Sequence, residues 1–264
     1  PAVVTIVNDA KAKADVLGAV EIGRIAGPFN RAKLANGTTE NRGGESTLGN
    51  LVAEVQRWAT AAPESGSAQI AFMNPGGLRA DMTGNAGGYP AVLTYKQAAS
   101  VQPFANTLVN MQLTGAQIKT ALEQQWQRDA AGNIPTRPFL RLGISAGFTY
   151  TYDPARPEGD RITGMWLRGA AIDPDGSYSV TVNSFLASGG DNFRVFAQGA
   201  DKRDTGQIDL TAMVDYLDEF ANTTAGDPPL PVAYDQRSVG VSFPAAAPAS
   251  YPRGAHVLFN VSSM

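Results

Sequence analysis

Asn74-Pro75-Gly76-Gly77-Leu78-Arg79 directly follows the apolar run Ile70-Ala71-Phe72-Met73, and the rest of the chain can be interpreted from this stretch. A short apolar run bounded by Gly and Pro is typical of a buried strand that stops abruptly, so the six residues are predicted to form a turn at its carboxyl end. The paired glycines allow backbone N–H groups to approach a ligand that a Cβ would keep away. The arginine supplies donors suited to phosphate or paired hydroxyls, and the asparagine supplies an amide that both donates and accepts. The alternative is an ordinary loop with a surface arginine.

A second predicted strand, Tyr178–Val182, ends in a similar turn. The stretch that follows is Asn183-Ser184-Phe185-Leu186-Ala187-Ser188-Gly189-Gly190-Asp191-Asn192-Phe193, in which an aromatic residue precedes paired glycines and a carboxylate follows them. In a third turn, Gln102-Pro103-Phe104-Ala105-Asn106, the proline fixes the backbone beside Phe104, so the ring can be presented outward. Core packing is the alternative for this phenylalanine, and residue spacing alone favours it.

Arg42 lies just ahead of a predicted helix. Ser46 or Thr47 can cap this helix, whose inner stripe is Leu48, Leu51, Val52, Val55 and Trp58. The positive end of a helix dipole favours an anion, and an arginine beside it adds a full charge. The alternative is that Arg42 is simply paired with Glu45.

The remaining residues alternate between helical and strand patterns. Val3, Ile6, Val7, Ala10 and Ala14 have helical spacing and leave Asp9, Lys11 and Lys13 outside. Further helices are predicted from Thr94 to Ser100, after the capping box Thr114-Gly115-Ala116-Gln117, and through Met213–Phe220. Strands are predicted at Val20–Arg24, Thr107–Leu113, Gly147–Tyr152 and Arg161–Leu167, with Val239–Val241 as the last.

Composition excludes several classes of protein. The chain has 264 residues, of which 43% are hydrophobic and 17% charged, as in a globular protein with a substantial core. A net charge of −3 argues against nucleic-acid binding, which usually requires a basic surface. No apolar run approaches the length of a membrane span.

Two absences limit the chemistry that the chain can perform. It has no cysteine, so it can form neither disulfides nor thiolate metal sites, and its only histidine, His256, lies in a Pro/Ala-rich tail. There is therefore no histidine cluster for a metal centre and no Ser-His or Cys-His pair. We predict no catalytic and no metal-ligating residues: unless carboxylates act alone, this chain binds a ligand without transforming it.

Four motifs, taken together and in this order, resemble the carboxyl-terminal domain of the 5'-nucleotidases, a family that also contains UDP-sugar hydrolases and 2',3'-cyclic phosphodiesterases. The resemblance extends from about Val3 to about Val241. Pro75 stands where the family often has glycine, and Ser188 where it often has asparagine, which leaves the fine substrate preference open. The motifs are Arg42-x-x-Glu45-Ser46-x-x-Gly49-Asn50-Leu51, Asn74-Pro75-Gly76-Gly77-Leu78-Arg79, Gln102-Pro103-Phe104-x-Asn106 and Phe185-Leu186-Ala187-x-Gly189-Gly190-Asp191.

The resemblance implies an α+β fold with a mixed β-sheet and flanking helices. It also implies a division of labour within a longer polypeptide, in which an amino-terminal metallophosphoesterase domain, absent here, holds two divalent metal ions and the catalytic Asp-His pair. The carboxyl-terminal domain would grip the nucleotide or nucleoside and rotate it onto the metals. This fragment, without a cofactor of its own, is then expected to be inactive alone, and the parent hydrolase to be secreted or at the cell surface.

By the same resemblance, Phe104 and Phe185 stack on either side of the base, a contact that tolerates different bases. Asp191 accepts hydrogen bonds from ribose hydroxyls, while Arg42 and Arg79 bind ribose or phosphate oxygens. Asn74 reaches the edge of the base. The two glycine pairs, Gly76-Gly77 and Gly189-Gly190, complete the predicted substrate-binding set.

Other interpretations remain. The chain can be a non-catalytic ligand-binding or cell-surface module that kept the fold, although the retained aromatic and charged residues argue against this. An acid–base hydrolase using its own carboxylates is disfavoured because no carboxylate pair is singled out by its surroundings. The natural substrate can be a nucleoside monophosphate, a cyclic nucleotide or a nucleotide sugar.

The ends of the chain suggest a piece of a longer polypeptide, since the sequence begins Pro1-Ala2-Val3, with neither an initiating methionine nor a signal-peptide pattern. We predict that residues 1–243 form the substrate-binding domain. Residues 244–264 are expected to be a Pro/Ala-rich linker and the start of a following segment.

Overall fold

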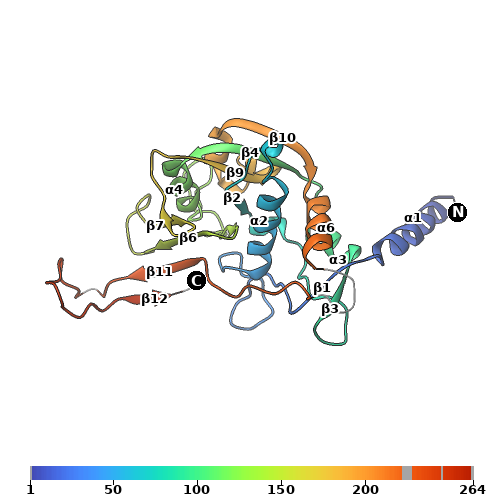
Figure 1. The fold of residues 1–264 in the computed structure, drawn as a ribbon, viewed down its shortest axis with the longest axis horizontal. Helices are drawn as coiled ribbons and strands as arrows, with labels where there is room; N and C mark the ends of the chain where they lie inside the picture. The colour runs from blue at the N-terminus through green and yellow to red at the C-terminus, as the bar shows by residue number, and fades with distance from the viewer. Residues whose placement is uncertain (1, 222–227, 245, 263–264) are drawn as a thin grey trace.

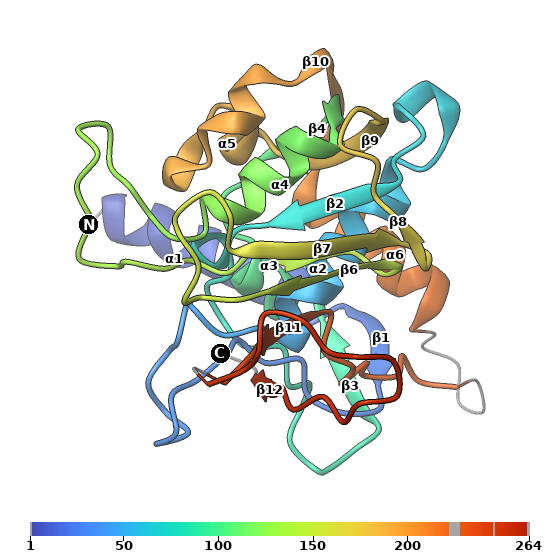
Figure 2. The same cartoon turned by 90° about the vertical axis from the view of Figure 1, so that its left-hand side faces the viewer.

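A five-stranded mixed sheet forms the centre of the domain (Figures 1 and 2). The computed structural model describes residues 2–221, 228–244 and 246–262. Strand β2 runs parallel to β9, whereas the other neighbours in the sheet are antiparallel. In spatial order the strands are β10 (Ala200–Ile208), β4 (Thr107–Thr114), β9 (Ser177–Asn183), β2 (Ile70–Met73) and β5 (Gly143–Ile144).

The alternation of side chains along the central strands divides the core into two layers. In β2, Phe72 belongs to one buried cluster and Met73 to the other, because successive side chains of a strand point to opposite faces. In β4, Met111 and Leu108 are divided in the same way. Both faces of the central sheet are therefore covered.

One face packs against helix α4 (Gly115–Glu123) and a second mixed sheet. Phe72 of β2 meets Phe148 of the second sheet edge-on, with ring centroids 5.8 Å apart. Thr114 begins α4 with the predicted capping box, in which its hydroxyl accepts from the Gln117 backbone. The second sheet has the order β12 (Asn260–Ser262), β11 (Ser238–Ser242), β6 (Phe148–Tyr152), β7 (Ile162–Leu167) and β8 (Ala170–Ala171).

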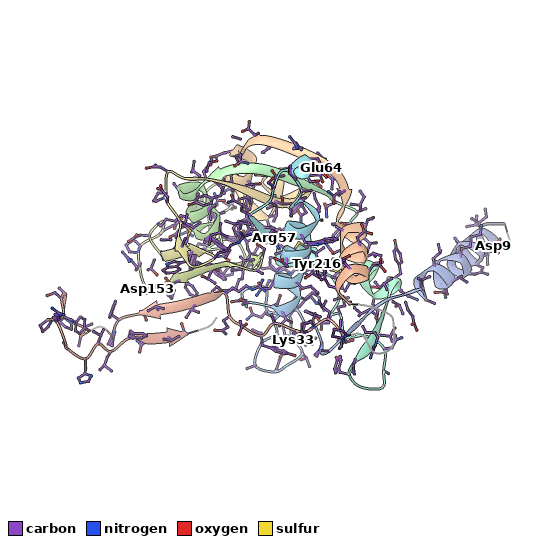
Figure 3. The ribbon with its side chains drawn as sticks, viewed as in Figure 1. Asp9, Lys33, Arg57, Glu64, Asp153 and Tyr216 are labelled. Atoms are coloured by element: carbon purple, nitrogen blue, oxygen red, sulfur yellow. The ribbon has the colours of Figure 1, made fainter. Side chains whose placement is uncertain are left out.

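The opposite face packs against three helices. The predicted cap of α2 is Ser46, whose hydroxyl accepts from the backbone N–H of Gly49 at 2.9 Å. Arg57 of α2 and Tyr216 of α6 lie close together (Figure 3). The ring of Trp58, next to Arg57 in the sequence, meets the Tyr216 ring edge-on with centroids 5.4 Å apart. The helices are α2 (Thr47–Ala59), α3 (Tyr95–Val101) and α6 (Asp209–Phe220).

The remaining elements are short or lie outside the main layers. Strands β1 (Glu21–Ile25) and β3 (Ala91–Thr94) form a separate antiparallel pair. The others are helices α1 (Ala2–Gly18) and α5 (Ser184–Ala187) and the 3₁₀ turns η1 (Pro63–Ser65), η2 (Pro75–Gly77), η3 (Gly190–Asn192) and η4 (Arg194–Gln198). None of the helices in the described ranges combines the length and the apolar character that crossing a bilayer requires. The predicted α+β class with a mixed sheet and flanking helices is confirmed.

Two predictions from the sequence need correction. The first segment is a helix, but its apolar stripe is not an inner face, because α1 extends away from the domain (Figures 1 and 3). Val3 and Ile6 of that stripe are 73% and 66% exposed. Strand Val239–Val241 is not the last, because β12 returns antiparallel to β11 with Val241 opposite Val261. The division of the chain at residue 243 stays a prediction.

Candidate functional site

Three turns meet at one edge of the central sheet. Strands β2 and β9 are parallel, so Asn74, which follows β2, and Asn183, which ends β9, lie at the same edge. Strand β4 is antiparallel to β9 and places Leu108 opposite Asn183, which brings the preceding Gln102–Asn106 turn to that edge too. The sheet topology therefore brings together segments that are far apart in the sequence, at the carboxyl ends of parallel strands where α/β sheets usually bind ligands.

A pocket of about 390 Å³ opens where the turns meet, within the usual range for small-molecule sites. Its walls carry both charge signs, several carboxamides and two aromatic rings. The lining residues are Arg42, Asn74, Gly76, Gly77, Phe104, Asn106, Asn183, Phe185 and Asp191.

A chain of carboxamide hydrogen bonds holds the carboxylate in this pocket. Asn183 donates from Nδ2 to Asn74 Oδ1 at 3.0 Å, and Asn74 donates from Nδ2 to Asp191 Oδ2 at 2.8 Å. Asn183 Oδ1 also accepts from the Leu186 backbone and so caps α5. Asp191 itself has a left-handed φ of 51°, which aspartate tolerates better than most residues. These bonds fix the carboxylate through Oδ2, and among the described residues Oδ1 of Asp191 accepts no hydrogen bond.

The two phenylalanines of the pocket are not core residues. Phe104 is 56% and Phe185 44% exposed, so the spacing-based preference for burying Phe104 is wrong. The guanidinium of Arg79 lies over the Phe104 ring, with its Cζ 5.8 Å from the ring centroid. Both rings present apolar surface to a polar pocket, which is typical of ligand contact more than of packing.

Gly190 is required by the ring of Phe185. A Cβ added to Gly190 would lie 2.5 Å from Cε1 of that ring, closer than real contacts allow. Gly76 is confined in a different way, since its Cβ would lie 3.2 Å from Asp191 Oδ2 and 3.3 Å from Arg42 Nη1. The glycines therefore let the ring and the charged groups approach the backbone.

We expect Gly190→Ala to displace the Phe185 ring and to weaken ligand binding several-fold while the protein stays folded. The physical reason is local, because the clash falls on a half-exposed side chain that can move. Titration calorimetry with adenosine, the kind of ligand that the family resemblance implies, and a melting curve would measure both properties. Gly27→Ala, remote from the pocket and with a nearest contact of 3.2 Å, is the matched control. Wild-type affinity in Gly190→Ala would show that the ring position is unimportant.

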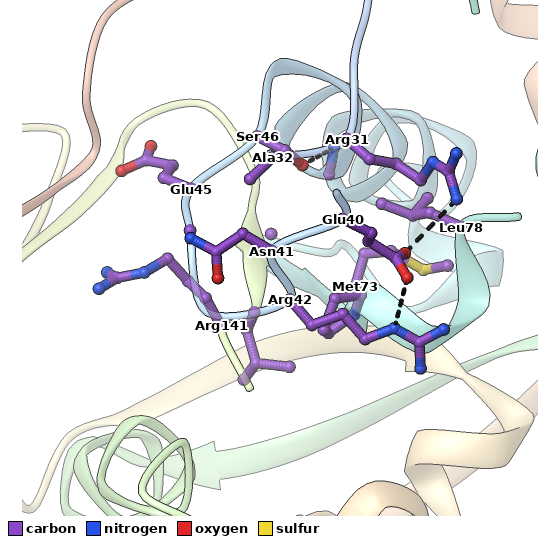
Figure 4. A pocket seen from close by; sticks show the side chains of 15 residues that line it. Arg31, Ala32, Glu40, Asn41, Arg42, Glu45, Ser46, Met73, Leu78 and Arg141 are labelled. Carbon is purple, nitrogen blue, oxygen red and sulfur yellow. Dashed lines mark hydrogen bonds and ion pairs between the residues drawn. The ribbon is translucent and has the colours of Figure 1, made fainter. Parts of the chain in front are cut away.

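Arg42 reaches the pocket from the loop before α2. Its Nε donates to Glu40 Oε2 at 3.1 Å, so the arginine is paired, though not with Glu45 (Figure 4). Glu45 instead accepts from the backbone of Arg237 and from Ser238. The Arg42 carbonyl accepts from the backbone N–H of Arg141 at 2.8 Å, which ties the loop to the chain segment before β5.

The structure places most of the predicted residues on the pocket wall and three beside it. Arg79, Gly189 and Gly190 are outside the lining; Gly189 has a φ of 88° that opens the turn around Asp191. Asn106 and Asn183 line the pocket but were absent from the predicted set. Both residues had a sequence signal. Asn183, like Asn74, directly follows an apolar strand pattern, and Asn106 belongs to the Gln102–Asn106 motif.

Asn106 rests on a buried carboxylate behind the pocket. It donates from Nδ2 to Asp209 Oδ2 at 3.2 Å, and burial raises the pKa of Asp209 against the hydrogen bonds that it accepts. Among the described residues no group of three or more His, Cys, Asp or Glu side chains could hold a metal ion. The pocket wall itself is made of polar, charged and aromatic side chains together with the two glycines.

The chain is thus a mixed α/β domain with a pocket of two exposed rings, an arginine and a held carboxylate. The sequence model described as "5'-nucleotidase, C-terminal domain" matches residues 21–198. The chain therefore belongs to the family of 5'-nucleotidase carboxyl-terminal domains.

Known proteins agree with this assignment. The trifunctional nucleotide phosphoesterase protein YfkN of Bacillus subtilis is 31% identical over 185 residues, which cover 67% of this chain and 12% of that protein. The 5'-nucleotidase of Homo sapiens is 29% identical over 159 residues, or 57% of this chain and 26% of that protein. The structure of a 5'-nucleotidase precursor from Thermus thermophilus matches with a TM-score of 0.63 at 30% identity, over 85% of this chain and 42% of that one. This chain thus spans less than half the length of each of these proteins.

Proposed function

We propose that this chain is the substrate-binding domain of a 5'-nucleotidase-like phosphohydrolase, which grips a nucleotide or nucleoside by its base and ribose. The observation that carries the proposal is the pair of exposed rings, Phe104 and Phe185, on a pocket that also presents Asp191 and Arg42. A nucleoside needs both kinds of surface, since its base offers a π-face and its ribose offers hydroxyls.

Each group in the pocket has a proposed role. The base lies between Phe104 and Phe185, and Asp191 Oδ1 accepts from the ribose hydroxyls. Arg42 donates to ribose or phosphate oxygens, as a guanidinium does well. Gly76, Gly77, Gly189 and Gly190 keep the backbone turns close to the ligand.

Two residues receive roles that follow from their contacts. Both polar ends of Asn74 already bond to protein and the side chain is 2% exposed, so we propose that it positions Asp191 in addition to bordering the base edge. Arg79, stacked on the Phe104 ring, would hold that ring and keep a positive charge near the ligand oxygens.

The hydrolytic chemistry belongs, in this proposal, to an amino-terminal metallophosphoesterase domain of the same polypeptide. That domain would hold two divalent metal ions, a charge that stabilises the attacking and leaving oxygens of a phosphate ester. The relatives include a cell wall protein of Listeria monocytogenes and a snake venom 5'-nucleotidase, which supports a secreted or cell-surface location.

The isolated chain is expected to bind AMP or adenosine but to release no phosphate above background. The reason is that the described residues lining the pocket include no nucleophile beside a base that could activate it. A phosphate-release assay with AMP and added Mg²⁺, Mn²⁺ or Zn²⁺, run beside a calorimetric titration, checks both halves. Turnover that survives repurification and disappears in Asp191→Asn would overturn the division of labour. Absence of binding to both ligands would overturn the proposed function itself.

A further inference from the structure

Arg31, Glu40 and Arg42 form a row of alternating charges along a small hollow (Figure 4), and Arg42 at its end also lines the pocket described above. Arg31 donates from Nε to Asp81 Oδ1 at 2.9 Å, and its Nη1 lies 3.5 Å from Glu40 Oε1. The other oxygen of Glu40 accepts from Arg42 Nε at 3.1 Å. Glu40 therefore bridges two arginines. Of these, only Arg42 lines the pocket that also contains Phe104, Phe185 and Asp191.

The inner end of this row is firmly held. Asp81 Oδ1 accepts from the backbone N–H of Arg31 as well as from its side chain, and Lys33 lies 3.1 Å from Oδ2. Burial by itself would raise the pKa of Asp81, but these hydrogen bonds outweigh it and the pKa lies below its usual value. Asp81 thus stays ionised near neutral pH and anchors Arg31.

The position of Glu40 is also set by the backbone. Lys33 and Glu40 face each other across an antiparallel bridge, and the Leu34 N–H donates to the Thr39 carbonyl inside it. This small hairpin places the carboxylate between the two arginines. The side chain of Glu40 is 30% exposed and that of Arg42 is 18% exposed, so water screens their contact only in part.

The bond to Nε determines which donors of Arg42 remain. A guanidinium has five N–H donors in a planar fork, and Glu40 takes the one at Nε. Within the part of the chain that the structure describes, Nη1 and Nη2 have no hydrogen-bond partner. Nη1 lies 3.3 Å from the Cβ position of Gly76, on the pocket wall beside Asp191.

We propose that Glu40 is a positioning residue, which holds Arg42 by Nε and thereby directs its two terminal nitrogens at the phosphate or ribose oxygens of the ligand. The inference rests on the proposed nucleotide-binding function. It adds a requirement that the four motifs do not contain, since Glu40 lies outside them. Without Glu40, the Arg42 side chain would lose rotamer freedom when the ligand binds, and this loss of entropy would weaken binding. The hydrogen bond to Glu40, called the tether below, restricts the side chain before the ligand arrives.

The test compares AMP binding by wild type and by Arg42→Ala, Glu40→Ala, Glu40→Gln and the double alanine variant, using titration calorimetry. Arg42→Ala should bind about tenfold more weakly or worse, as expected for the loss of a charged hydrogen-bond donor. Glu40→Ala should lose most of that factor, whereas Glu40→Gln should stay within about twofold of wild type because its amide oxygen still accepts from Nε. The double variant should be no weaker than Arg42→Ala.

Asp160→Ala is the matched control, because it removes one negative charge from an exposed pair with Arg156 at 2.6 Å. It should leave AMP binding unchanged. A ligand-free readout is the Nε–H signal of Arg42 in a ¹H–¹⁵N NMR spectrum, identified by its loss in Arg42→Ala. We expect it to be protected from exchange in wild type and in Glu40→Gln but not in Glu40→Ala.

Several outcomes would overturn the proposal. They are wild-type affinity in Glu40→Ala, a double variant whose loss is the sum of the single losses, and an Nε–H signal that is indifferent to Glu40. A wild-type chain that binds neither AMP nor adenosine would overturn the proposed function instead, while the NMR signal would still report on the tether.

Discussion

Replacing Phe185 with alanine is expected to weaken adenosine binding by about 1 to 3 kcal/mol, and Phe104→Ala to do the same, because each loses one stacked ring. Both side chains are about half exposed without ligand, so neither substitution removes a core contact. The melting temperature should therefore stay near that of wild type. Calorimetry and thermal unfolding of the two variants measure the two properties separately.

Phe243 provides a matched control for the stacking prediction. It is 57% exposed, as exposed as Phe104, but lies outside the pocket. Phe243→Ala should leave adenosine binding unchanged. The stacking proposal would be excluded if Phe104→Ala and Phe185→Ala kept full affinity and melted earlier, since this pattern belongs to structural residues.

Removing the carboxylate of Asp191 is expected to cost about 1.5 to 3 kcal/mol of affinity for ribonucleosides, the usual loss for a hydrogen bond to a charged group. The same change should matter much less for 2',3'-dideoxy analogues, which lack the hydroxyls. Asp191→Gly tests the carboxylate more cleanly than Asp191→Ala does. Glycine accepts the φ of 51° at this position, whereas alanine would add backbone strain there. Calorimetry with adenosine and 2',3'-dideoxyadenosine gives the comparison.

Asn74→Ala helps to interpret this result. It removes the 2.8 Å hydrogen bond to Asp191 Oδ2 but keeps the carboxylate, so its effect on adenosine should be smaller than that of Asp191→Gly. Equal losses on both sugar types for Asp191→Gly would rule out the hydroxyl contact. They would indicate that Asp191 acts only through the shape of its turn.

The sequence was sufficient to predict those structural features in which a residue acts on its immediate neighbours in the chain. Ser46 and Thr114 cap the helices that the sequence assigned to them, because a hydroxyl reaches a backbone N–H three residues ahead regardless of the remaining fold. The turn after Met73 was predictable for a similar reason, since Pro75 fixes its own φ and the two glycines after it allow a tight turn.

Secondary-structure elements that depend on partners distant in the sequence were harder to predict. Strand β10 was not predicted, because this edge strand is mostly polar and exposed and is defined by pairing such as Arg203 opposite Asn110. Strand β12 likewise becomes visible only through its pairing with β11. The apolar spacing of α1 predicted a helix correctly, but periodicity alone does not reveal whether a surface exists for the helix to cover.

The sequence by itself determined the capped helices, the apolar strands and the turns that carry Asn74, Phe104 and Asp191. Its motifs also indicated the family, since four short patterns in a fixed order are far more specific than any one of them. Those properties depend on residues close together in the chain.

Only the tertiary structure decided that these turns form one pocket. The parallel pairing of β2 with β9 brings Asn74 beside Asp191, although 117 residues separate them in the sequence. The exposure of the two rings and the pairing of Arg42 with Glu40 were decided in the same way. The physical reason is that burial and ion pairing depend on which surfaces meet, and strand order and packing determine those surfaces.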